Sequence, residues 1–291
     1  MSTGIMEPSA PNEMSQTLYL GRTWQHSILG CKANHFIRPD SGIFGGTEVY
    51  PPFSYPWMAM ILTRTSATQA TLCGGTLIDR ETILTAAHCV DMAASPDIVM
   101  IQLHRHNRSR TVREENGFVS GVKSIIIHPE WEREKLVNDY AILKLTSPAP
   151  HEPVITLDDG TMSVAGSNVR ALGWGRIDEQ RAADTLQQVN LQIFPHKNCE
   201  RRLRGFDARY TLCAGTKDGG ENICFGDSGG PLIQMNENGP PILVGVTSFT
   251  RNCEPDFPSG FARVAARKAW IEGHLTPRTS NSPLAREISE S

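Results

Sequence analysis

Apolar residues along this chain come in short runs that are separated by glycine, proline, asparagine and charged clusters. Many of the runs alternate apolar with polar positions, which is the period of a β-strand with one buried face. Antiparallel sheets commonly bury only one face, so the pattern indicates an all-β, antiparallel protein with a loop-rich barrel architecture. We predict strands at 57–62, 98–103, 124–128, 140–145, 169–174, 186–194 and 242–249.

Helical periodicity is confined to three short places. Apolar residues stand at helical spacing in 264–275. The segment 81–90 has room for a single turn around His88, and 195–203 has room for another. Residues 1–42 carry little periodic apolar pattern, and the segment after Pro277 is rich in serine, threonine, asparagine and proline. We therefore predict a poorly ordered leader over 1–42, a folded domain over 43–275 and a disordered tail over 276–291.

Composition excludes some partners. The chain has 291 residues and 39% hydrophobic content, which suffices for a substantial core. A formal net charge of -3 provides no basic field for nucleic acid. The chain contains no run of about 18 apolar residues, so no membrane-spanning helix is predicted. Seven dispersed cysteines indicate disulfides and an oxidising compartment, although the first residues lack the pattern of a secretory signal.

One stretch, Gly226-Asp227-Ser228-Gly229-Gly230, has the pattern of a nucleophile site. A hydroxyl between glycines can be approached by an extended substrate, and the amides of a glycine-rich loop are free to face an anion. A tight surface turn explains the same residue types. The hypothesis therefore depends on finding a base and an orienting acid elsewhere in the chain.

Two residues fit those roles. His88 follows small residues and precedes Cys89, so a disulfide could hold its backbone while the imidazole stays accessible. Asp139 stands at the head of an apolar strand, where a buried carboxylate is costly unless it pairs with a group such as an imidazole N–H. A strand-initiating cap is the simpler interpretation of Asp139 alone.

Together these stretches resemble the chymotrypsin-like (trypsin-fold) serine peptidases, in which the base, the acid and the nucleophile follow in this order. The resemblance extends over 43–275 and includes further landmarks at Trp57, 73–78, 173–175 and Trp270. It implies an all-β fold of two six-stranded antiparallel Greek-key β-barrels. The active site would lie between the barrels, and a short helix would end the domain.

The resemblance also assigns roles. Ser228 would be the nucleophile, His88 the general base and Asp139 the residue that fixes the imidazole, while the amides of Gly226 and Ser228 would bind the oxyanion. No cofactor and no metal are implied, because Arg105 stands where calcium-binding relatives carry an acid. The implied disulfides are Cys73–Cys89, Cys199–Cys213 and Cys224–Cys253, and Cys31 is left over.

Relatives are made as zymogens that are cut before a start similar to Ile43-Phe44-Gly45-Gly46. The new amino terminus of Ile43 would then pair with Asp227. Trypsin-like activators need Arg or Lys before the cut, whereas this chain has Asp40-Ser41-Gly42. We expect either an activating protease that prefers small residues or no normal activation.

The expected specificity pocket differs from that of trypsin. Asn222, followed by Ile223, falls on the pocket floor, where trypsin-like members carry an aspartate. One wall is Ser248-Phe249-Thr250, whose backbone would pair with the substrate as an added strand. Thr250 and Ser259 replace the glycines of wide pockets, so cleavage is expected after small or medium uncharged residues.

The sequence thus predicts a secreted, monomeric serine endopeptidase made as a zymogen. Its partners would be polypeptide substrates, protein protease inhibitors and an activating protease. The alternative is a non-catalytic homologue that serves as a binding or regulatory module on the same scaffold. The missing basic activation site, the unusual pocket floor and the unpaired Cys31 favour that alternative, and the intact triad opposes it.

Overall fold

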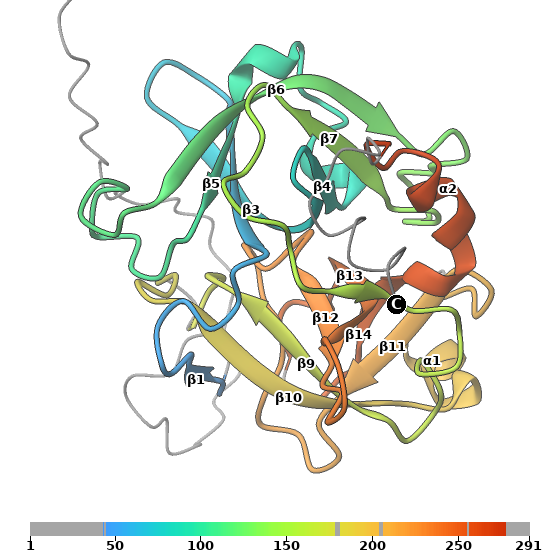
Figure 1. Cartoon of the computed structure of the whole chain (residues 1–291). Coiled ribbons are helices and arrows are strands. Elements are labelled where there is room, and N and C mark those ends of the chain that lie inside the picture. Colours follow the sequence, from blue (N-terminus) through green and yellow to red (C-terminus); the bar gives the residue numbers. More distant parts are fainter. Residues whose placement is uncertain (1–42, 44, 178–180, 204–205, 255, 278–291) are drawn as a thin grey trace, which may run out of the picture. The chain divides into compact units, whose positions relative to one another are not determined.

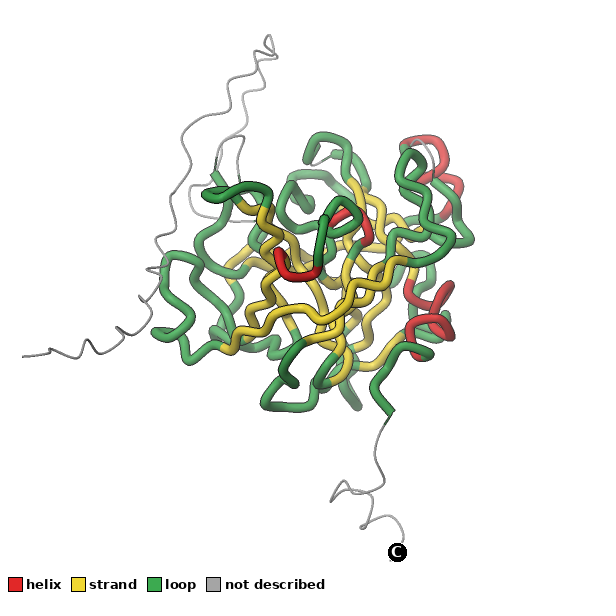
Figure 2. Tube along the Cα trace, turned by 90° about the horizontal axis from the view of Figure 1, so that it is seen from above, coloured by secondary structure: helices red, strands yellow, loops and turns green. Residues whose placement is uncertain are grey.

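The computed structural model describes residues 43, 45–177, 181–203, 206–254 and 256–277. The predicted leader with Cys31, the residues before Ile43 and all but the first two residues of the predicted tail lie outside the described residues. Within the described part, strands dominate and the helical segments are short (Figure 1) (Figure 2). The all-β prediction is confirmed.

The first barrel is antiparallel and closed. Its strands lie side by side in the order β2-β3-β4-β7-β6-β5, and β5 pairs back with β2. The strands are β2 (Met58–Arg64), β3 (Ala70–Asp79), β4 (Thr82–Thr85), β5 (Val99–Leu103), β6 (Phe118–Ile127) and β7 (Ala141–Leu145).

The second barrel repeats this strand order. The order is β9-β10-β11-β14-β13-β12, and β12 pairs back with β9, so the prediction of two six-stranded barrels is confirmed. Two short strands, β1 (Thr47–Glu48) and β8 (Thr156–Leu157), add to β10 and β13 respectively. The barrel strands are β9 (Asn168–Gly173), β10 (Gln187–Ile193), β11 (Thr211–Gly215), β12 (Pro231–Gln234), β13 (Ile242–Phe249) and β14 (Ser259–Arg263).

The helical predictions hold in part. The segment 195–203 contains α1 (His196–Arg202), and β14 is followed by the 3₁₀ turn η3 (Val264–Arg267) and by α2 (Lys268–Glu272). The 3₁₀ turns η1 (Ala87–Cys89) and η2 (Pro96–Ile98) are the other short helical segments. No helix in the described ranges is long and apolar enough to cross a membrane.

The single turn predicted around His88 within 81–90 is present as η1, and the residues before it form a strand that was not predicted. Residues 82–85 form β4, in which every residue is buried, and β4 pairs with both β3 and β7. Only the second half is helical, as η1 around His88. The burial of both faces hides the alternation from which a strand would be predicted.

The apolar core joins the two barrels. The cluster that fills the first barrel continues into Leu172, Trp174 and Val246 of the second barrel region. A separate cluster, which includes Val169 and Phe261, fills the second barrel. Close-packed cores deform little, so side chains from the two barrels can be held in a fixed relation.

The loop 105–117 is organised around a buried cation that belongs to the chain itself. The guanidinium of Arg105 donates from Nε to Glu115 Oε2 at 2.7 Å and from Nη1 to Gln102 Oε1 at 2.8 Å. Its Nη2 donates to the carbonyls of Asn107 and Arg110 at 3.0 and 2.6 Å. A side-chain cation thus occupies the interior of the loop for which calcium binding was considered.

Removing one partner of the Arg105–Glu115 pair should be strongly destabilising, because only 3% of each side chain is exposed. We expect Glu115→Gln to lower the free energy of unfolding by about 3–5 kcal/mol, since it leaves the guanidinium charge buried without its partner. Urea denaturation measures this change. The control is Glu132→Gln, which breaks an exposed pair with Lys135 and should not change the midpoint measurably. Equal effects of the two variants would contradict the role of burial.

Candidate active site

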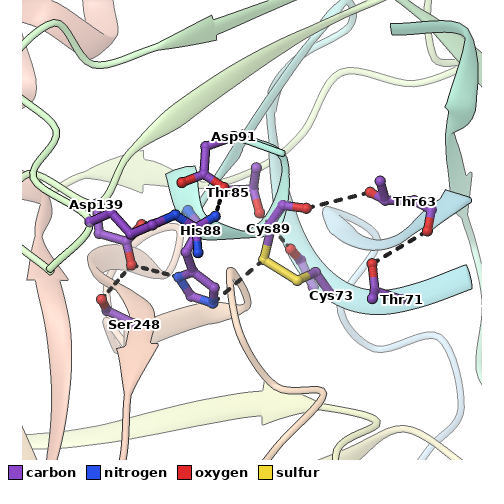
Figure 3. The surroundings of a disulfide bond; sticks show 11 residues. Thr63, Thr71, Cys73, Thr85, His88, Cys89, Asp91, Asp139 and Ser248 are labelled. Carbon is purple, nitrogen blue, oxygen red and sulfur yellow. Dashed lines mark hydrogen bonds and ion pairs between the residues drawn. A yellow bond between two sulfur atoms is a disulfide. The ribbon is translucent and has the colours of Figure 1, made fainter. Parts of the chain in front are cut away.

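The predicted base and acid are brought together by strand pairing. β4 pairs with β7 so that Thr85 lies opposite Ala141, and the residues after β4 therefore meet those before β7. His88 Nδ1 lies 2.7 Å from Asp139 Oδ2, and the backbone N–H of His88 donates to Asp139 Oδ1 at 3.0 Å (Figure 3). Two bonds thus orient the imidazole against this carboxylate.

Asp139 is fully buried and its burial is compensated by three donors. Besides His88, the hydroxyl of Ser248 on β13 donates to Asp139 Oδ2 at 2.5 Å (Figure 3). Ser248 was predicted to line the substrate wall through its backbone, and its side chain points to the acid. The carboxylate therefore holds groups from both barrels.

The surroundings of His88 favour its protonated form. Burial opposes protonation, but the hydrogen bond to Asp139 and the charges of Asp139 and Asp91 outweigh it and raise the pKa of His88 above the usual value. The charge of Arg133 acts in the opposite direction. The side chain keeps 21% of its surface exposed, so the ring can still be reached from solvent.

The loop that carries Ser228 lies against the first barrel. The Gly74 N–H on β3 donates to the carbonyl of Ser228 at 2.7 Å, and the Gly229 N–H donates to Thr247 O at 2.8 Å. A Cβ on Gly74 would lie 2.7 Å from Gly230 Cα, and a Cβ on Gly229 would lie 2.2 Å from Thr85 Oγ1. Glycine on both sides of this contact, Gly74 on β3 and Gly229 in the loop, allows the loop to pack against the end of β4, which leads to His88.

The amides of Gly226 and Ser228 donate to no other residue in the part of the chain that the structure describes. Gly229 and Gly230, in contrast, use their amides within the fold. Nor does the Ser228 hydroxyl bond to His88 among the described contacts, and His88 Nε2 lies 3.9 Å from Cys89 Sγ. Catalytic hydrogen bonds are often long in free enzymes, so this geometry is compatible with a nucleophile and its base.

Asp227 is fully buried beneath Gly173-Trp174-Gly175. Its Oδ1 accepts from the Gly175 N–H and its Oδ2 from the Cys224 N–H, each at 2.8 Å. Burial raises the pKa of Asp227 to about 6 despite these two bonds. Ile43 is also fully buried and belongs to the same apolar cluster as Ile223, so both members of the predicted activation pair lie inside the second barrel region.

The predicted pocket floor has no free hydrogen-bonding group. Asn222 is fully buried, and its Nδ2 donates to the carbonyls of Glu254 and Phe257, each at 2.9 Å. Its Oδ1 accepts from the Ile223 N–H at 2.9 Å and from the Ser259 hydroxyl at 2.7 Å. An asparagine side chain offers two donors and two lone pairs, so Asn222 is saturated by the protein.

Three other residues near the predicted pocket differ in what their side chains contact. Thr250 Oγ1 is buried and has no partner among the described residues. A Cβ on Gly45 would lie 2.8 Å from Glu221 Cγ, so Glu221 packs near the amino-terminal segment. Phe249 is half-buried and packs against the cluster around Cys199 and Cys213. Of the side chains of the predicted wall 248–250, only that of Thr250 offers an unused polar group.

The structure contains the three disulfides that the family resemblance implied: Cys73–Cys89, Cys199–Cys213 and Cys224–Cys253. Cys73, Cys89 and His88 hold possible metal-ligand atoms within 4.8 Å of one another. Zinc binds cysteine as the thiolate, and both sulfurs here are engaged in a disulfide. This cluster therefore does not suit a metal ion, and the disulfide instead fixes the turn that carries His88.

Comparison with known proteins shows which family the chain belongs to. The family model described as Trypsin matches residues 43–271. The chain is 34% identical over 270 residues to Ovochymase-2 of Mus musculus, covering 86% of this chain and 43% of that relative. It is 33% identical over 238 residues to coagulation factor XI of Bos taurus, covering 79% and 37% respectively.

A third relative is similar along most of the chain. Mannan-binding lectin serine protease 1 of Homo sapiens is 32% identical over 293 residues, covering 93% of this chain and 41% of that protein. The chain thus spans less than half the length of each of these three relatives.

The closeness of Gly175 to Asp227 can be tested by substitution. A Cβ on Gly175 would lie 2.5 Å from Asp227 Cγ, so Gly175→Ala should displace the carboxylate and the loop 224–230. We expect a loss of about 1–3 kcal/mol in the free energy of unfolding, measured by urea denaturation. The control is Gly121→Ala, in which the new Cβ would lie 3.3 Å from Thr146 Oγ1, so the loss in the free energy of unfolding should be smaller. A Gly175→Ala variant as stable as the control would argue against this packing.

Proposed function

Because this chain belongs to the trypsin family, we propose that it is a serine endopeptidase in which Ser228, His88 and Asp139 hydrolyse peptide bonds. The observation that carries the proposal is the pair of unused amides, Gly226 and Ser228, in a loop that rests against the turn of the Asp139-bonded His88. A nucleophile, an oriented base and free anion donors are the parts that acyl transfer requires.

The proposed reaction proceeds in two halves. The Ser228 hydroxyl attacks the scissile carbonyl while His88 Nε2 accepts its proton, and the amides of Gly226 and Ser228 stabilise the oxyanion. His88 then returns the proton to the leaving amine, which leaves an acyl-enzyme. A water molecule then attacks the acyl-enzyme by the same steps and releases the carboxylic acid product. Asp139 keeps the proton of the imidazole on Nδ1 and stabilises the imidazolium that forms.

We further propose that the chain is a zymogen activated by cleavage before Ile43. In the continuous chain, the ionised Asp227 has two backbone donors but no cation among its described contacts, which agrees with a pKa raised to about 6 by burial. Ionisation of Asp227 therefore costs stability as the pH rises through that value. A new ammonium at Ile43 would compensate the charge and hold the oxyanion loop in place.

The proposed specificity is for small or medium uncharged residues before the scissile bond. The saturated Asn222 has no hydrogen-bonding group left for a substrate cation, and it carries no charge. Thr250 and Ser259 add side chains where wide pockets have glycine, so the pocket should be narrow. The peptide backbone would pair with 248–250 as an added strand.

The remaining biological assignments follow from the same family. We propose 1–42 as a propeptide, 43–275 as the peptidase domain and 276–291 as a tail. The three disulfides are consistent with secretion and an extracellular site of action. Its partners would be polypeptide substrates, an activating protease and protein inhibitors, and the protein would act as a monomer.

Reactivity of Ser228 tests the proposed mechanism. A chain that begins at Ile43 should react with a fluorophosphonate at Ser228 much faster than the full chain, because only its ammonium can pair with Asp227. Mass spectrometry locates the label, and Ser228→Ala should prevent it. Asp139→Asn should lower kcat by about 10⁴-fold, since it upsets the imidazole tautomer. An unreactive Ser228 in the chain that begins at Ile43 would favour the non-catalytic binding module.

Cleavage of a peptide library tests the proposed pocket. The chain that begins at Ile43 should prefer small or medium uncharged residues before the cleaved bond. The Thr250→Gly variant should shift the preference toward larger side chains, because it removes a side chain from the wall while Asn222 stays saturated. A clear preference of the unmodified pocket for Arg or Lys would contradict this assignment.

A further inference from the structure

We propose that Asp91 is a positioning residue that fastens the loop leading to Asp139 onto the turn that carries His88. This inference rests on the proposed function. We call residues 128–138 the acid loop and residues 86–91 the base turn. Asp91 ends the base turn, and its backbone N–H donates to Ala87 O at 2.8 Å.

The carboxylate of Asp91 reaches across to the acid loop with both oxygens. Its Oδ2 accepts from Trp131 Nε1 at 2.9 Å, and its Oδ1 pairs with the guanidinium of Arg133. Only 9% of the Asp91 side chain is exposed, whereas 50% of Arg133 is exposed. Among the hydrogen bonds of the described residues, those between the acid loop and the base turn all end on Asp91.

The acid loop has an unusual backbone conformation shortly before Asp139. Leu136 has a φ of 53°, which is strained for a leucine, and Asn138 has a φ of 57°, which asparagine adopts more readily than most residues. Asn138 is held by Glu130 O at 3.0 Å and by Arg267 at 2.8 Å. Those bonds tie the loop to itself and to η3, so Asp91 supplies the link to the base.

Asp91 also acts on His88 through its charge. The charged groups that face His88 are Asp139, Asp91 and Arg133. Asp91 stabilises the imidazolium and Arg133 destabilises it, so the two charges of the pair partly cancel at the ring. Removing either charge alone should therefore move the titration of His88, and the two directions should be opposite.

Two conservative variants separate the charge of Asp91 from its shape. Asp91→Asn keeps an acceptor for Trp131 but removes the negative charge, so the pKa of His88 should fall. Arg133→Gln removes the positive charge, so the pKa of His88 should rise. NMR titration of labelled histidine in the chain that begins at Ile43 measures both changes. The acid limb of kcat/KM should move in the same direction, because the reaction requires a neutral imidazole.

Truncation tests the mechanical part of the inference. Asp91→Ala removes both links to the acid loop, and the resulting misplacement of Asp139 and His88 should lower kcat by roughly 10-fold or more. Asp91→Asn should recover part of that loss, because it can still accept from Trp131. If Asp91→Ala does not fold, the two conservative variants still decide the question.

The matched control lies in the same loop. Glu132→Gln removes a carboxylate that is 52% exposed and pairs with Lys135, so it should leave the His88 titration unchanged. An unchanged titration and unchanged activity in Asp91→Asn and Arg133→Gln would overturn the inference. If the titration moves as expected but no variant cleaves peptides, the effect of the Asp91 charge on His88 stands and the proposed function fails.

Discussion

The structure depends on one buried charge, the carboxylate of Asp139. It is stable inside the protein because His88 supplies two donors from the first barrel and Ser248 supplies one from the second. The next residue, Tyr140, is also fully buried, and its hydroxyl donates to Arg263 O at 2.7 Å, which adds a second bond between the barrel regions. The need to compensate the buried Asp139 carboxylate therefore constrains both the packing of the two barrels and the orientation of the imidazole.

Close backbone contact is the second theme of the site. The loop of Ser228 touches β3 and the end of β4 through glycines, and Asp227 lies against Gly173 and Gly175. No side chain fits at these contacts, so residues far apart in sequence must be glycine together. This requirement explains why glycine pairs recur in the stretches on which the family resemblance rests.

Alternation of apolar and polar residues predicted the strands that expose one face, and it failed where both faces are buried. All five residues of β11 are buried, as are all four of β4, so neither strand alternates. β3 was also missed as a strand, although its Gly74 and Gly75 were noted as family landmarks. These glycines interrupt its apolar pattern, and their role becomes visible only when the loop of Ser228 is packed against them.

By itself the sequence determined the all-β class, the identity of the base, acid and nucleophile candidates and, through the family resemblance, the disulfide pairing. Only the tertiary structure decided how the polar groups are used. The side-chain amide of Asn222 donates to the carbonyls of Glu254 and Phe257, Ser248 turns toward Asp139, and Asp91 reaches Trp131. Each of these partners is distant in sequence, and a backbone carbonyl carries no residue-type signal. Local pattern therefore cannot reveal such contacts, because they exist only once the barrels have packed.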